Sequence, residues 1–151
     1  MDNDVELWME YGAKKKNTMV FIDAESVSSN HCSKIIGQAR SAGEIYEARY
    51  YALQNDPSTS AWKSAAKMYG IKPILLYGEP AHNKIDNKII KDIKRIVESN
   101  KSIDIFCIAS RDGDYSEIVK YLRQKKKRVV ILAAKNTSRD LKNCASEIKR
   151  I

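Results

Sequence analysis

Short apolar runs alternate with helical patterns along the chain. The apolar runs lie at residues 18–23, 44–51, 71–77, 103–109 and 128–133. Amphipathic helical patterns occupy residues 31–42, 59–69, 85–98, 115–126 and 138–149. Strands that alternate with helices are typical of a parallel sheet, and right-handed crossovers place helices on both of its faces. We therefore predict an α/β fold, a three-layer sandwich around a mainly parallel five-stranded sheet.

The first residues stand apart from this alternation. Residues 5–11 could form a short helix, and three lysines follow at positions 14–16. We predict that residues 1–17 are an N-terminal extension and that residues 18–151 form one domain. A domain of this length can bury a substantial hydrophobic core.

Acidic residues directly follow two of the apolar runs. Asp23 comes after Val20–Ile22, while Asp112 and Asp114 lie just beyond Ile103–Ala109. Ligands of open α/β sheets bind beyond the carboxyl ends of the strands, so we expect these carboxylates to converge there. Clustered carboxylates repel one another unless a cation neutralises them, and all-oxygen ligation favours Mg²⁺ or Mn²⁺ over Zn²⁺. The sequence thus predicts a magnesium or manganese site; for Asp112 and Asp114 a helix-capping turn is the alternative.

Two more acids lie on the predicted helix at residues 85–98. At 100° per residue its isoleucines gather on one side and its lysines on the other. Asp86 and Asp92 project within the apolar arc, where a carboxylate needs a partner. For Asp86, in the first turn, we favour metal binding over an interaction with the helix dipole. For Asp92, a buried contact with a lysine or a backbone group explains the position as well as ligation, so Asp92 is a secondary candidate.

The net charge of +8 contrasts with this acidic site. Lysine and arginine side chains attract phosphate backbones, while an acidic pocket would hold the metal ion that acts on one phosphate. A basic surface also serves solubility, so the charge supports a polyanionic partner without establishing one. Glu25 could add a ligand or could belong to an ordinary loop. The candidate substrate contacts at the same edge are Ser26, Lys84, Ser110, Arg111 and Lys135.

Cellular location is indicated by what the sequence lacks. The three cysteines are far apart and have no metal-ligand spacing, which fits reduced thiols. No apolar run is long enough to span a membrane, and the acidic N-terminus does not fit a signal peptide. We expect a cytoplasmic protein with no membrane partner, and the sequence leaves homo-oligomerisation open.

Taken together, the acidic segments resemble NYN domains, which belong to the PIN-like nuclease superfamily. The resemblance covers about residues 18–151 and is carried by Val20–Ser26, Lys84–Asp86 with Asp92, Ser110–Tyr115, Lys127–Leu132 and Asn136–Leu141. It implies a Rossmann-like, PIN-like sandwich, an acidic pocket for Mg²⁺ or Mn²⁺, and RNA cleavage. By position, Asp23, Asp86, Asp112 and Asp114 match that pocket, and Asp92 matches a further acid of the family.

The resemblance leads to a functional hypothesis with one alternative. We expect a metal-dependent endoribonuclease that hydrolyses RNA phosphodiester bonds, with Asp23, Asp86, Asp112 and Asp114 as catalytic metal ligands. The family usually has asparagine at the position of Ser26 and glycine at that of Arg111. These departures favour the alternative, a non-catalytic module that binds RNA or protein through a degenerate nuclease pocket.

Overall fold

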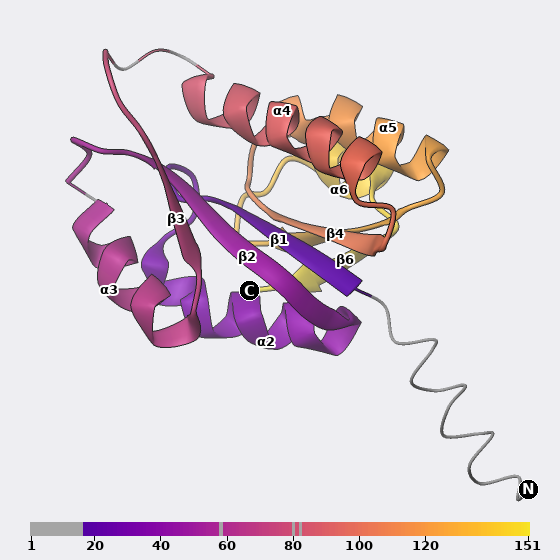
Figure 1. Cartoon of the computed structure of the whole chain (residues 1–151), viewed down its shortest axis with the longest axis horizontal. Coiled ribbons are helices and arrows are strands. Elements are labelled where there is room, and N and C mark those ends of the chain that lie inside the picture. Colours follow the sequence, from indigo (N-terminus) through magenta and orange to yellow (C-terminus); the bar gives the residue numbers. More distant parts are fainter. Residues whose placement is uncertain (1–16, 58, 80, 82) are drawn as a thin grey trace, which may run out of the picture.

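Figure 1 shows a computed structural model of the chain, which describes residues 17–57, 59–79, 81 and 83–151. Six strands form one sheet: β1 (Asn17–Asp23), β2 (Glu44–Leu53), β3 (Lys72–Leu76), β4 (Ile103–Ala109), β5 (Arg128–Ala133) and β6 (Glu147–Arg150). Their order is β3-β2-β1-β4-β5-β6, and every neighbouring pair is parallel. The predicted α/β fold class is confirmed.

Helices cover both faces of this sheet (Figure 1). On one face lie α2 (Cys32–Ala42) and α3 (Thr59–Tyr69), and on the other lie α4 (Lys84–Ser99), α5 (Ser116–Gln124) and α6 (Arg139–Cys144). Two short 3-10 helices, η1 (Ser29–His31) and η2 (Gly113–Tyr115), precede α2 and α5. The arrangement is the three-layer sandwich expected from the pattern of the sequence.

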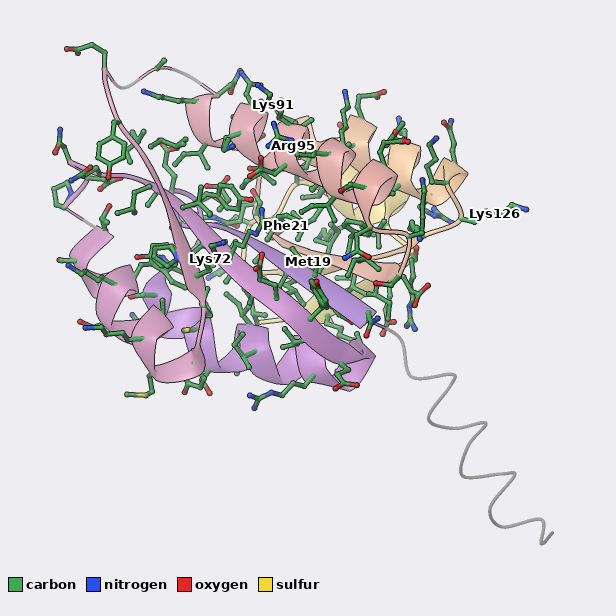
Figure 2. The ribbon with its side chains drawn as sticks, viewed as in Figure 1. Met19, Phe21, Lys72, Lys91, Arg95 and Lys126 are labelled. Carbon is green, nitrogen blue, oxygen red and sulfur yellow. The ribbon has the colours of Figure 1, made fainter. Side chains whose placement is uncertain are left out.

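The central strands are apolar throughout because both of their faces are buried. Along β1, Met19 and Phe21 pack in the core under α4 and α5, whereas Val20 and Ile22 pack against α2. Figure 2 labels Met19 and Phe21 on this strand. Phe21 stacks on Phe106 of β4 with 6.2 Å between ring centroids, which joins the two central strands. Asp23 ends the same strand, so its position relative to the sheet is firmly fixed.

The sixth strand corrects the prediction at the C-terminal end. A helix was expected over residues 138–149, but α6 ends at Cys144 and β6 pairs with β5. Ser146 makes the turn: its backbone N–H donates to the Val129 carbonyl at 2.9 Å, and its hydroxyl accepts from the Val129 N–H at 3.0 Å. A strand of four residues is too short for its alternation to stand out against a neighbouring helical pattern.

Two further observations bear on the expectations. The expected short helix at residues 5–11 lies outside the described residues, as do residues 1–16 of the predicted extension, whereas Asn17 begins β1. Of the helices in the described part of the chain, none has the length and apolar character that a membrane span needs.

Candidate functional site

The acidic residues meet where the direction of the chain across the sheet reverses. From β1 the chain builds β2 and β3 on one side and then crosses over to β4 on the other side. The connections therefore diverge at the carboxyl ends of β1 and β4, which is where ligands bind in open parallel sheets. Asp23 ends β1, and Asp112 follows β4 by three residues.

Three carboxylates form a cluster at this edge. Asp86 lies in the first turn of α4, Asp112 caps η2 and Asp114 lies within η2, and each offers an oxygen within 4.8 Å of the others. Asp86 is buried, Asp112 is half-buried and Asp114 is exposed. Gly113 has no side chain between the two acids, and a Cβ atom there would lie 2.8 Å from Ser138 Oγ. We refer to Asp86, Asp112 and Asp114 as the acid cluster.

Among the residues that the structure describes, the acid cluster has no neutralising cation. Across the described ranges, no lysine or arginine lies within ion-pairing distance of Asp86, Asp112 or Asp114. Burial raises the pKa of Asp86, and the neighbouring charges of Asp112 and Asp114 raise it further. The Asp112 side chain accepts the Asp114 N–H at 2.9 Å, so the expected helix-capping turn also forms. Asp112 therefore caps η2 and belongs to the acid cluster at the same time.

Asp23 lies beside the acid cluster and is held by hydrogen bonds. One of its carboxylate oxygens accepts from the Tyr115 hydroxyl at 3.1 Å and from the Ser110 hydroxyl at 3.2 Å, and the other accepts from the Glu25 N–H at 3.1 Å. It is 5% exposed, and this burial raises its pKa to about 6. Asp23 is not one of the three mutually close carboxylates.

Ser110 links Asp23 to the acid cluster. Its hydroxyl, which donates to Asp23, also accepts the Asp112 N–H at 3.1 Å and lies 3.1 Å from the Ser26 hydroxyl. Arg111 is exposed, and its Nε donates to the Ser26 carbonyl at 2.8 Å. The guanidinium is therefore anchored on the loop after β1 and forms no ion pair with the described carboxylates of the cluster.

Asp92 belongs to a different network, under the middle of α4. Its carboxylate accepts from the Tyr51 hydroxyl at 2.8 Å, pairs with Lys88 at 2.9 Å and lies 3.6 Å from Arg49. It is 6% exposed, so Asp86 and Asp92 are both buried, as expected for acids within the apolar arc of α4. The two carboxylates nevertheless belong to different networks. Of the two explanations left open for Asp92, the buried contact with a lysine is the one that the structure displays.

The remaining candidates lie around the edge of the site. Lys84 begins α4, and its ammonium group donates to the carbonyls of Tyr77 and Glu79 in the preceding loop. Glu25 is exposed and contributes only its backbone N–H to Asp23. Lys135 is exposed after β5, where it lines a hollow beside β6.

The acid cluster has the chemistry and the spacing of a divalent cation site. Oxygens bound to Mg²⁺ at about 2.1 Å lie at most about 4.2 Å apart, on opposite sides of the ion. The separations in the cluster come within 4.8 Å, so small side-chain rotations bring the three oxygens to ligand positions. Hard oxygen donors without nitrogen or sulfur suit Mg²⁺ or Mn²⁺. The residues present therefore fit a metal ion of this class.

Comparison with family models identifies the chain. The model of the NYN domain matches residues 17–149, which is most of the sequence. The chain belongs to the NYN family. The resemblance inferred from the acidic segments is thereby confirmed.

Two further comparisons relate this NYN domain to known proteins. No match is found among curated proteins. Among solved structures, the domain is similar to a crystal structure of a protein of unknown function from Vibrio parahaemolyticus RIMD 2210633. The two share 23% sequence identity with a TM-score of 0.76, over 91% of this chain and 93% of that one. The similarity establishes the shared fold.

One residue of the NYN domain site was not singled out from the sequence. Tyr115 is fully buried at the start of α5, and its hydroxyl donates to Asp23. Burial raises the pKa of Tyr115, and the charges of Asp23 and Asp86 raise it further, so the hydroxyl stays protonated and remains a donor. The available signal was an aromatic residue directly after the Asp112–Asp114 turn. Core packing explained that aromatic residue equally well.

Proposed function

We propose that this NYN domain is a metal-dependent ribonuclease that hydrolyses phosphodiester bonds in RNA. The observation that carries the proposal is the acid cluster, in which Asp86, Asp112 and Asp114 approach one another with no lysine or arginine of the described ranges paired to them. RNA is taken as the substrate from the family and from the net charge of +8. A polyphosphate backbone would be attracted by that charge.

In this proposal Asp86, Asp112 and Asp114 hold Mg²⁺ or Mn²⁺. When bound, such an ion stabilises the charge that develops on the phosphate and lowers the pKa of a bound water. Asp23 completes the acidic pocket as a fourth carboxylate. Its pKa of about 6 leaves it mostly ionised above neutral pH, and Tyr115 fixes its orientation.

The substrate contacts are assigned around this pocket. Ser26 and the exposed Arg111 lie on the loops that border it and are proposed to contact phosphate. Ser110 is completely buried, so we propose that it positions Asp23 and Asp112 instead of touching the substrate. Lys84 and Lys135 add positive charge at the same edge, and Glu25 and Asp92 stay secondary to the site.

A non-catalytic RNA- or protein-binding module is the second candidate. It is favoured by the residues at positions 26 and 111, where Ser26 and Arg111 replace the asparagine and glycine usual in the family. The Arg111 side chain donates to the Ser26 carbonyl at 2.8 Å, so these two residues are in direct contact at the edge of the pocket.

Cleavage of labelled RNA, single-stranded and structured, separates the two functions. The wild type is compared with Asp112→Asn in Mn²⁺, in Mg²⁺ and in chelator. Asp104→Asn is a matched control, because it is the same substitution at the opposite end of β4. The nuclease proposal expects cleavage by the wild type and by the control, with loss in chelator and in Asp112→Asn. RNA binding without cleavage in either metal would support the binding module instead.

A further inference from the structure

The outer face of α4 carries a row of cations that starts at the acid cluster. Lys84, Lys88, Lys91 and Arg95 are separated by four, three and four residues. At 100° per residue they lie within about 60° of one another, and a rise of 1.5 Å per residue sets Arg95 about 16 Å from Lys84 along the axis. We call these four residues the α4 cation row. Figure 2 shows Lys91 and Arg95 on this helix.

The sheet adds two cations on the same side as α4. Arg49 on β2 and Lys72 on β3 are directly opposite each other in the parallel register. They share a face with Tyr51 and Ile74, which pack in the core under α4. Figure 2 shows Lys72 on β3 from the same viewpoint as Lys91 and Arg95. The cations therefore extend from α4 across the edge of the sheet.

Two cations of this row, Lys91 and Arg95, carry no ion pair in the described structure. On the next helix, by contrast, Lys120 pairs with Glu117 at 3.5 Å. Like charges separated by four residues destabilise a helix by a few tenths of a kcal/mol per pair. Lys91 and Arg95, which lie four residues apart and have no acidic partner among the described residues, therefore carry a local cost, which an anionic partner would remove.

Buried groups hold the middle of this surface in place. Asp92, 6% exposed, pairs with Lys88 at 2.9 Å and lies 3.6 Å from Arg49. The buried Tyr51 hydroxyl donates to the same carboxylate at 2.8 Å. Burial raises the pKa of Tyr51, as does the charge of Asp92, so this donor stays protonated. Lys88 and Arg49 are thus oriented before any partner arrives, which reduces the entropy lost on binding.

We propose that the α4 cation row, with Arg49 and Lys72, binds the RNA backbone and leads the strand to the acid cluster at the start of α4. This inference rests on the proposed function. Asp92 is a positioning residue for Lys88 and Arg49 in this surface. The ammonium of Lys84 is engaged by loop carbonyls, Lys88 pairs with Asp92, and Arg49 pairs with Glu47 and Asp92. The direct phosphate contacts therefore fall to Lys91, Arg95 and Lys72.

The test measures binding of a labelled RNA oligonucleotide by fluorescence anisotropy in chelator, over a series of salt concentrations. The double variant Lys91→Gln/Arg95→Gln removes two exposed cations of the row. The double variant Lys63→Gln/Lys67→Gln is the matched control, because it removes two exposed cations with the same spacing from α3, on the opposite face of the sheet. Both variants lower the net charge equally and spare the acid cluster.

In Lys91→Gln/Arg95→Gln, the loss of two phosphate contacts should make the slope of log K for RNA association against log salt concentration shallower by about 1.4. Binding should weaken about twentyfold near 0.1 M salt. The α3 control should stay close to the wild type in both quantities. Equal weakening of the two variants would overturn the proposal, because net charge alone would then explain the affinity. Binding of a labelled polyglutamate peptide as tight as that of RNA would also overturn it.

The outcomes separate this inference from the proposed function. If the wild type binds RNA through α4 but never cleaves it with Mn²⁺, the nuclease function fails and the binding surface stands. If the wild type cleaves RNA while the α4 variant binds like the α3 control, the nuclease function stands and the α4 surface fails.

Discussion

Asp23 is predicted to destabilise the metal-free protein at neutral and alkaline pH. Its carboxylate is 5% exposed, and burial raises its pKa from 3.8 to about 6. The folded state therefore binds the proton of Asp23 more tightly than the unfolded state does. Ionisation of the carboxyl group is harder in the folded protein than in the unfolded chain, so it lowers the free energy of unfolding. This loss of stability is absent below the unfolded pKa of 3.8, grows between 3.8 and about 6, and is complete above about pH 6.

The magnitude follows from the two pKa values. The difference between 3.8 and about 6 corresponds to about 3 kcal/mol at pH values above both. Asp23→Asn removes this cost but disturbs the hydrogen bonds from Ser110, Tyr115 and Glu25, since an amide has one acceptor oxygen. A disturbed hydrogen bond costs about 1 kcal/mol. We expect Asp23→Asn to stabilise the metal-free protein by about 1–2 kcal/mol near pH 8.

The assay is urea unfolding in chelator at about pH 8 and about pH 4, with the wild type, Asp23→Asn and the control Asp104→Asn. The stabilisation by Asp23→Asn should shrink or reverse at the lower pH, while Asp104→Asn changes little at either. An Asp23→Asn protein that is no more stable than the wild type near pH 8, or a gain that is the same at both pH values, would refute this account of Asp23.

Three further predictions concern the neighbours of Asp23. Tyr115→Phe removes a hydrogen bond that holds the pKa of Asp23 down, so that pKa should rise above about 6, as measured by NMR titration of the carboxyl carbon; an unchanged value would contradict the contact. Asp92→Asn removes the buried carboxylate that pairs with Lys88 and lies 3.6 Å from Arg49, although Arg49 keeps its pair with Glu47, and should cost about 2 kcal/mol in urea unfolding, with RNA binding weakened as well; a neutral effect on both would contradict the positioning role. Mn²⁺ at a hundred times its Kd should stabilise the wild type by about 2.7 kcal/mol and Asp86→Asn by much less, as followed by thermal unfolding; an equal shift for both would place the ion elsewhere.

The strand and helix pattern was predictable for the central part of the fold. The apolar runs at Val20–Ile22 and Ile103–Ala109 are buried on both faces, so their composition alone marks them as central strands. The helix at Thr59–Tyr69 agrees with its expected bounds. The strand Glu147–Arg150 was missed because its pairing with β5 depends on tertiary contacts, including those of Ser146 with Val129.

The approach of three acidic residues was predictable from the sequence, whereas the place of Asp23 outside this group was not. Convergence of Asp86 with Asp112 and Asp114 followed from strand ends and helix phase, because parallel strands bring their carboxyl ends to one edge. The separate role of Asp92 could not be read from the sequence. It depends on the side chains of Tyr51 and Arg49, forty residues or so earlier, which reach the same point under α4.

The most direct test of the central claim is an anomalous difference map from crystals of the protein grown with MnCl₂. The account predicts a peak among the carboxylates of Asp86, Asp112 and Asp114, with Asp23 beside it, and no such peak in crystals of Asp112→Asn. A clear manganese peak at another place, or none at the acid cluster in well-ordered crystals, would contradict the assignment of this cluster as the metal site.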